Sequence, residues 1–147
     1  VLGLVLQHVF DMQPCAWCTF QRLIFLVVGA CALAGWLASG RSRAVAAAAS
    51  TLAVVAALGG LWAALHQQFV AAQAQSCAFT FADRMLMRLR LDEALPWLFE
   101  PTASCAEANV PLFGLPFALW SAALFALLAA LAARAALRTR TRMEITA

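Results

Sequence analysis

The sequence predicts an all-α membrane protein, a four-helix transmembrane bundle with a long outer loop that carries a short interfacial helix. Hydrophobic residues make up 65% of the chain and charged residues 12%, there is no lysine, and the mean hydropathy is +0.85. A chain of 147 residues with this composition has too little polar surface to cover a water-soluble globule. Long uncharged runs, with arginines gathered at some of their ends, also indicate helices that cross a membrane.

The first predicted span is the N-terminal segment Val1–Phe10, which precedes Asp11. At about 1.5 Å per residue this segment covers roughly half of the hydrocarbon layer. We therefore expect the first helix to continue upstream of Val1, with a cleaved signal peptide as the alternative. A longer reading frame with further apolar sequence would distinguish the two.

Three further spans are predicted from runs without a formal charge. Leu23–Ala38 is marginal alone and long enough together with Phe20 and Gln21, because flanking side chains can reach the interface. Ala44–Leu65 and Leu112–Ala133 are each long enough to cross the hydrocarbon as a helix. The alanine-rich first half of Ala44–Leu65 predicts close packing between helices.

Arginine placement predicts the orientation, because cytoplasmic loops and tails collect positive charge. Six of the ten arginines follow the second or the last predicted span: Arg41, Arg43, Arg134, Arg138, Arg140 and Arg142. The opposite side then receives the loops at about residues 11–19 and 67–111, which carry four of the five cysteines. In a bacterium this side is the oxidising periplasm, where disulfides persist. The net charge of +3 is explained by this topology, and the basic tail lacks the interleaved aromatic residues of a nucleic-acid groove.

The long loop contains a candidate helix within Asp83–Phe99, where arginines are mixed with large apolar residues. Pro96 breaks this run before it could span the hydrocarbon. The pattern fits a helix that lies on the membrane surface, and it fits equally a solvated loop helix packed on the bundle. In either case the segment stands between Cys77 and Cys105, so its movement could carry those sulfurs toward or away from the bilayer.

Four cysteines fall into two pairs, Cys15 with Cys18 as Cys-Ala-Trp-Cys and Cys77 with Cys105 in the long loop. A close Cys-x-x-Cys pair can be oxidised, reduced or metallated. Pro14 ends the first helix, so the close pair occupies the corner from which the next helix starts. Unsatisfied amides and the positive dipole end of that helix favour a thiolate at Cys18.

Arg22 follows Cys18 by four residues and therefore lies on the same helical face. It brings a permanent positive charge within one turn of the thiol. An arginine at this depth, taken alone, is more often a boundary residue that extends to the lipid head groups. The four-residue offset from Cys18 favours a part in the redox site.

A zinc site is the alternative for the close pair, but structural zinc needs four ligands. His8 and His66 lie near the outer face without the spacing of a zinc finger, and we predict no metal. Both histidines are interpreted as interfacial residues, with a hydrogen bond from His66 to a bound ligand as a minority hypothesis. Cys31 lies in the middle of a span and is interpreted as a small hydrophobe.

Three parts of the sequence carry a resemblance to a known family: QHVFDMQPCAWCTFQR, then Cys77 with the SCAE string at Ser104–Glu107, and PLFGLPFALW. Together they resemble the bacterial disulfide bond formation protein B (DsbB) family over nearly the whole chain. The most specific part is the PCxxCxxxR motif, formed here by Pro14, Cys15, Cys18 and Arg22. The resemblance implies a four-helix transmembrane bundle and a single domain over residues 1–147.

The resemblance also implies a quinone-linked oxidase of the bacterial inner membrane. Cys77 looks like the cysteine that forms a mixed disulfide with a DsbA-like periplasmic thioredoxin-fold oxidase. Cys105 looks like its resolving mate, which would exchange with Cys15. Cys18 looks like the cysteine that faces ubiquinone or menaquinone, with Arg22 beside the quinone head group.

Two other function classes remain open from the sequence. A protein like vitamin K epoxide reductase also combines four helices, a Cys-x-x-Cys and a quinone, but in that family the loop pair precedes the Cys-x-x-Cys. A non-enzymatic membrane module would use its cysteines only to staple loops or to hold metal. Stoichiometric zinc or redox-inert disulfides would indicate this second alternative.

Overall fold

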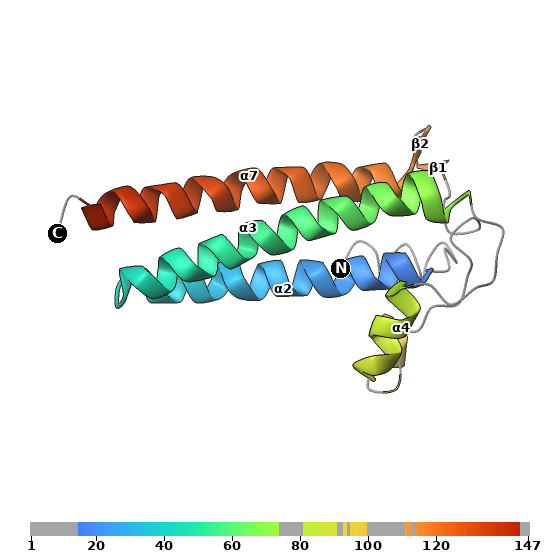
Figure 1. The fold of residues 1–147 in the computed structure, drawn as a ribbon, viewed down its shortest axis with the longest axis horizontal. Helices are drawn as coiled ribbons and strands as arrows, with labels where there is room; N and C mark the ends of the chain where they lie inside the picture. The colour runs from blue at the N-terminus through green and yellow to red at the C-terminus, as the bar shows by residue number, and fades with distance from the viewer. Residues whose placement is uncertain are drawn as a thin grey trace. The chain divides into compact units, whose positions relative to one another are not determined.

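The computed structural model describes residues 15–73, 81–90, 93, 95–99, 111–112 and 114–144 (Figure 1). The predicted span Val1–Phe10 lies outside the described residues. The described part is largely helical, which confirms the prediction of a helical membrane protein. Its elements are α2 (Ala16–Ala38), α3 (Arg43–His66), the π-helix η1 (Gln67–Ala71), α4 (Phe81–Arg88), α6 (Pro96–Phe99), β1 (Pro111–Leu112), β2 (Leu115–Pro116) and α7 (Phe117–Glu144).

Three helices in the described residues are long and apolar enough to cross a membrane, judged by length and composition. They are Ala16–Ala38, Arg43–Ala71 and Phe117–Thr141, so all three spans predicted from uncharged runs are confirmed. Large apolar side chains such as Leu33 and Trp36 are exposed along them. Such exposure suits contact with lipid rather than with water.

The last span begins later than predicted, at Phe117 instead of Leu112. Residues Pro111–Leu112 and Leu115–Pro116 pair as a two-stranded antiparallel hairpin, and Gly114 in its turn has φ 81°. A positive φ suits glycine, and proline lacks the amide hydrogen that a helix interior requires. These residues therefore form a hairpin ahead of α7 rather than the first turn of that helix.

The chain divides into two compact units, each described separately. The first, here called the helical unit, comprises Leu23–Trp62 and Ala122–Ala147. Its core contains Val28, Ala57 and Ala129, and Phe25 stacks on Phe125 with ring centroids 4.0 Å apart and an interplanar angle of 9°. Several alanines of α3 are buried, which confirms the close helix packing expected from the small residues: Ala46, Ala47, Ala53 and Ala57.

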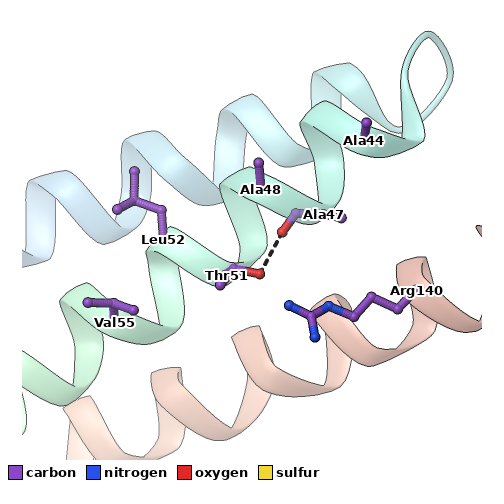
Figure 2. Close-up of a pocket in the computed structure, with 7 residues that line it drawn as sticks. All are labelled: Ala44, Ala47, Ala48, Thr51, Leu52, Val55 and Arg140. Atoms are coloured by element: carbon purple, nitrogen blue, oxygen red, sulfur yellow. Dashed lines mark hydrogen bonds between the residues drawn. The ribbon is translucent and has the colours of Figure 1, made fainter.

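A cavity of about 610 Å³ lies between α3 and α7 within the helical unit (Figure 2). Small and aliphatic side chains of α3 line it, and the Arg140 guanidinium extends toward them from α7. Thr51 does not present a free hydroxyl proton there, because its Oγ1 donates a hydrogen bond of 2.9 Å to the carbonyl of Ala47. None of the cysteines that the structure describes is among the residues that line this cavity.

The second unit, here called the thiol unit, comprises Val1–Arg22 and Ala63–Ser121. Aromatic side chains join its elements, since Phe20 of α2 meets Phe81 of α4 edge to face at 6.1 Å. Within α4, Ala82 and Leu86 are fully buried while the remaining face is largely exposed. The short loop helix expected from the sequence is therefore present and packs on this unit, and its position on a membrane surface remains a prediction.

The loop helix ends earlier than the sequence pattern indicated. α4 stops at Arg88, and Arg90 has a positive φ of 50°, which a continuing helix does not allow. Pro96 breaks the run as predicted, since Leu95 is not helical and Pro96 opens the separate short helix α6. Proline suits the first helical position because its missing amide hydrogen would have no partner there.

Candidate redox site

The close cysteine pair lies at the start of α2. Cys15 is the last residue before the helix, and its carbonyl accepts hydrogen bonds of 3.0 Å from both the backbone N–H and the Oγ1 of Thr19. The sulfur of Cys15 accepts the backbone N–H of Cys18 at 3.4 Å. This is the bond that a serine or aspartate side chain makes when it caps a helix. Cys15 is thus the N-cap of α2 and Cys18 lies in its first turn, at the helix N-terminus expected from Pro14.

The two sulfurs are adjacent, with Cys15 Sγ and Cys18 Sγ 3.0 Å apart. One thiol can donate its hydrogen to the other at this distance. A small rotation of either side chain would bring the sulfurs to the separation of a disulfide, about 2.05 Å, and the bond forms when an acceptor takes up two electrons. Cys15 is fully buried and Cys18 is partly buried.

A pair of buried glutamines adjoins Cys18. Gln67 donates a hydrogen bond from Nε2 to Cys18 Sγ at 3.1 Å, and its Oε1 accepts one from Gln21 Nε2 at 2.6 Å. Gln67 is 1% exposed and Gln21 is 3% exposed. The chain of bonds therefore runs from Gln21 of α2 to Gln67 of η1 and back to the Cys18 thiol of α2, away from solvent.

The π-helix places Gln67 in this position. The sequence indicated that the loop begins at Gln67, but the helical backbone continues through Gln67–Ala71 as η1. The wider turn of a π-helix is frequent at functional sites. Sequence reasoning missed both glutamines as site residues. A signal was present, because Gln21 is an uncharged polar residue in an apolar helix three residues after Cys18.

Arg22 lies one helical turn after Cys18 and donates a hydrogen bond of 3.0 Å from Nη1 to the carbonyl of Leu98 in α6. Its charge also acts on the sulfurs of Cys18 and Cys15. The arginine is partly buried and holds the loop helix rather than simply extending to lipid head groups. It therefore links the close cysteine pair to the segment that lies between Cys77 and Cys105 in the sequence.

His66 is the last residue of α3, next to Gln67, and its ring lies 4.7 Å from the ring of Trp17, centroid to centroid, at 32°. Trp17 is 2% exposed and stands between the two cysteines of the motif. Its ring also meets Phe20 edge to face at 6.2 Å. The stacked rings thus bring the end of α3 against the start of α2, beside the thiols.

The remaining sequence-predicted residues are separate from this group or undescribed. Cys77, Cys105 and His8 lie outside the described residues. Cys31 lies in α2 within the helical unit, partly buried. Among the residues that the structure describes, no three His, Cys, Asp or Glu side chains are grouped so that they could hold a metal ion.

Comparisons with known proteins agree on one family. The family model described as disulfide bond formation protein DsbB matches residues 1–135. A Pseudomonas aeruginosa protein named disulfide bond formation protein B 2 is 37% identical over 147 residues, covering 94% of this chain and 83% of its own. Similar proteins named disulfide bond formation protein B occur in Nitrosospira multiformis, 33% identical over 88% of this chain and 77% of its own, and in Burkholderia thailandensis, 31% identical over 97% and 83%.

Proposed function

The chain belongs to the DsbB family of disulfide bond formation proteins, and from that premise we propose that it re-oxidises a DsbA-like periplasmic thioredoxin-fold oxidase and passes two electrons to a membrane quinone. The protein is a multi-pass protein of the inner membrane that takes part in disulfide bond formation. Its chemistry is thiol–disulfide exchange, for which the Cys15–Cys18 pair is suited.

One observation supports the proposal most directly. Cys18 is partly buried, and three groups that favour a thiolate adjoin it: the Cys15 thiol at 3.0 Å, the Gln67 amide at 3.1 Å and the Arg22 charge one helical turn away. A thiolate is the nucleophile in thiol–disulfide exchange. The arrangement lies at the end of helices apolar enough to cross a membrane, where a lipid-soluble acceptor is available.

The proposed exchange begins in the long loop. A thiolate of the reduced partner attacks Cys77 Sγ of the Cys77–Cys105 disulfide, which forms a mixed disulfide and releases the Cys105 thiolate. The second thiol of the partner attacks its own mixed disulfide, so the partner leaves oxidised and the Cys77–Cys105 pair has gained two electrons and two protons. The loop thiolate of Cys105 then attacks Cys15 Sγ of the Cys15–Cys18 disulfide and releases Cys18 as a thiolate.

The close pair then returns to its starting state. Cys77 displaces Cys15 from Cys105, which restores the loop disulfide and leaves Cys15 and Cys18 reduced. The Cys15–Cys18 disulfide is restored when this pair gives up two electrons and two protons. A quinone supplies that acceptor when bound, since its reduction to a quinol takes up two electrons and two protons. The overall reaction converts one dithiol and one quinone to one disulfide and one quinol.

The residues around Cys18 fit such an acceptor. A quinone head group is planar and carries two carbonyl oxygens, and the Arg22 guanidinium is a donor that such oxygens accept. Phe20, partly buried, places an aromatic ring beside the cysteines. We propose that Cys18 and Arg22 contact the head group, with His66 as a third contact.

Redox potentials favour a quinone over soluble thiols as acceptor. A strongly oxidising partner has a potential of about −120 mV, and a glutathione-like pool lies near about −200 mV. Passing two electrons from the former to the latter is uphill by about 80 mV, or about 4 kcal/mol. Exchange with glutathione could therefore not keep the partner oxidised, and a more oxidising acceptor is required.

The test is quinone reduction by the full chain in detergent. Purified protein is mixed with a reduced thioredoxin-fold oxidase and a soluble analogue of ubiquinone or menaquinone, and the loss of quinone absorbance is followed. Cys18→Ala should abolish turnover, whereas Cys31→Ala, a cysteine of the same helix outside the site, should not change it. Absence of turnover with both quinone types in folded wild-type protein would refute the proposal.

A second variant separates the two cysteine pairs. Cys77→Ser should abolish turnover with the protein partner, while a small dithiol such as dithiothreitol should still drive quinone reduction through Cys15 and Cys18. Undiminished turnover of the protein partner by Cys77→Ser would contradict the role assigned to Cys77.

A further inference from the structure

We propose that Gln67 is a catalytic residue whose amide N–H stabilises the Cys18 thiolate, and that Gln21 is a positioning residue that determines which end of that amide faces the sulfur. The inference rests on the proposed function for the use of the Cys18 thiolate in exchange. It deepens that function by assigning two residues that the cysteine motif and Arg22 leave without a role.

The geometry of the two amides makes the arrangement directional. A glutamine amide has a donor end and an acceptor end, and Gln67 could present either one to Cys18. Gln21 Nε2 donates to Gln67 Oε1 at 2.6 Å, which leaves Gln67 Nε2 to face Cys18 Sγ at 3.1 Å. With the acceptor end occupied by Gln21, the sulfur meets a donor.

A donor at this distance favours one ionisation state of the thiol. A thiolate only accepts hydrogen bonds, and a bond to a charged acceptor is about twice as strong as one between neutral groups. A neutral thiol gains less from the same N–H, because its sulfur is a weak acceptor. The Gln67 amide therefore favours the reactive form of Cys18.

Burial makes this effect larger than it would be at the surface. Gln67 is 1% exposed and Gln21 is 3% exposed, so water does not replace the amide when it is removed. Hydrogen bonds are electrostatically stronger where the local dielectric is low. Arg22 also favours the thiolate, and its guanidinium donates to the Leu98 carbonyl. Unlike the Gln67 amide, a guanidinium has no acceptor end, so its orientation does not depend on Gln21.

A purely structural role is the alternative, because buried amides commonly hydrogen-bond one helix to another in membrane proteins. Such a role requires that the two glutamines pair with each other and does not require that Nε2 face the sulfur. Reactivity of Cys18 with a small alkylating agent distinguishes the two, because the thiolate and not the thiol is alkylated.

The experiment uses the reduced full chain in detergent, a short pulse of iodoacetamide, and peptide mass spectrometry to count modification at Cys18. Gln67→Met keeps the length of the side chain and removes the donor. Gln21→Glu keeps the length of the other side chain and presents only acceptors, so the Gln67 amide turns its N–H toward the carboxylate and its oxygen toward Cys18. Gln68→Met, on the same π-helix, is the matched control because no hydrogen bond joins the Gln68 side chain to Cys18 in the described structure.

At pH 7 we expect both Gln67→Met and Gln21→Glu to slow modification of Cys18 by about tenfold or more, the effect of removing a hydrogen bond to a charged group. Gln68→Met should react as the wild type does. At a pH of about 10.5, where an ordinary thiol is ionised, the variants should regain the wild-type rate. Slowing at both pH values would mean altered access and would overturn the proposal, as would wild-type rates at pH 7. Neither quinone nor the protein partner is present, so the result does not depend on the proposed electron acceptor.

Discussion

Replacing Gly60 with alanine should lower the free energy of unfolding, whereas the same change at the neighbouring Gly59 should not. Both glycines lie in α3 within the helical unit. A methyl carbon at Gly60 would lie 2.5 Å from Cδ1 and from Cζ of Phe125, and closer still to Cε1. A methyl carbon at Gly59 would meet nothing within 4 Å. The two positions thus form a matched pair on one helix.

The magnitude depends on whether the Phe125 ring can move. Carbon atoms that are not bonded prefer to lie about 3.5 to 4.0 Å apart, so the overlap at Gly60 is about 1 Å or more. Phe125 is fully buried and its ring stacks on Phe25 with centroids 4.0 Å apart, which blocks an easy displacement. Overpacking of this kind costs about 1–3 kcal/mol. Alanine also raises helix propensity by about 1 kcal/mol at either position, so the difference between the two variants isolates the overlap.

Thermal unfolding in detergent measures that difference. A change of 1 kcal/mol shifts the midpoint by roughly 2–4 °C in a chain of this size, so Gly60→Ala should melt several degrees below Gly59→Ala. In a Phe125→Leu background, Gly60→Ala should lower the melting midpoint by less than it does in the wild type, because the smaller leucine side chain leaves room for the methyl group. Equal midpoints for Gly59→Ala and Gly60→Ala would refute the reasoning.

Two further changes test the thiol unit. Arg22→Lys keeps the positive charge but loses the guanidinium N–H that reaches the Leu98 carbonyl at 3.0 Å, so limited proteolysis should cleave the loop faster; cleavage at the wild-type rate would contradict the anchoring of α6. Thr19→Val keeps the shape of a fully buried side chain and removes the Oγ1 hydrogen bond to Cys15, which should destabilise the protein by about 0.5–1.5 kcal/mol; an unchanged melting midpoint would show that this bond contributes nothing to stability.

The three long helices could be predicted from the sequence because their signal is local and strong. An uncharged apolar run of sufficient length specifies a helix in lipid whatever surrounds it. The ends of those helices depend on weaker signals. Leu112 lies in an apolar run, yet the prolines beside it and the positive φ of Gly114 produce a hairpin before α7 begins. The prolines and Gly114 are visible in the sequence, but the span was predicted from the apolar run alone, which does not distinguish a hairpin from a helix start.

The site was predictable only where its parts are close in the chain. Cys15, Cys18 and Arg22 lie within two helical turns, so their spacing places them on one side of α2. The contact between Gln21 and Gln67 joins residues 46 positions apart and depends on a π-helix that no local pattern announced. Long-range pairing of this kind follows from the packing of α2 against the end of α3, which a single sequence does not specify.

A neutral donor beside Cys18 avoids an energetic cost that a second cation, in addition to Arg22, would carry when the sulfur loses its charge. During the proposed cycle the Cys18 sulfur alternates between a disulfide, which carries no charge, and a thiolate, which carries a full negative charge. A buried cation in contact with the sulfur would lose its counter-charge in the disulfide state, at a cost of several kcal/mol. The acceptor end of the Gln67 amide is already bonded to Gln21, so only its N–H faces the sulfur whose charge changes. Arg22 meets the same requirement differently, because its guanidinium has a partner other than the sulfur, the Leu98 carbonyl.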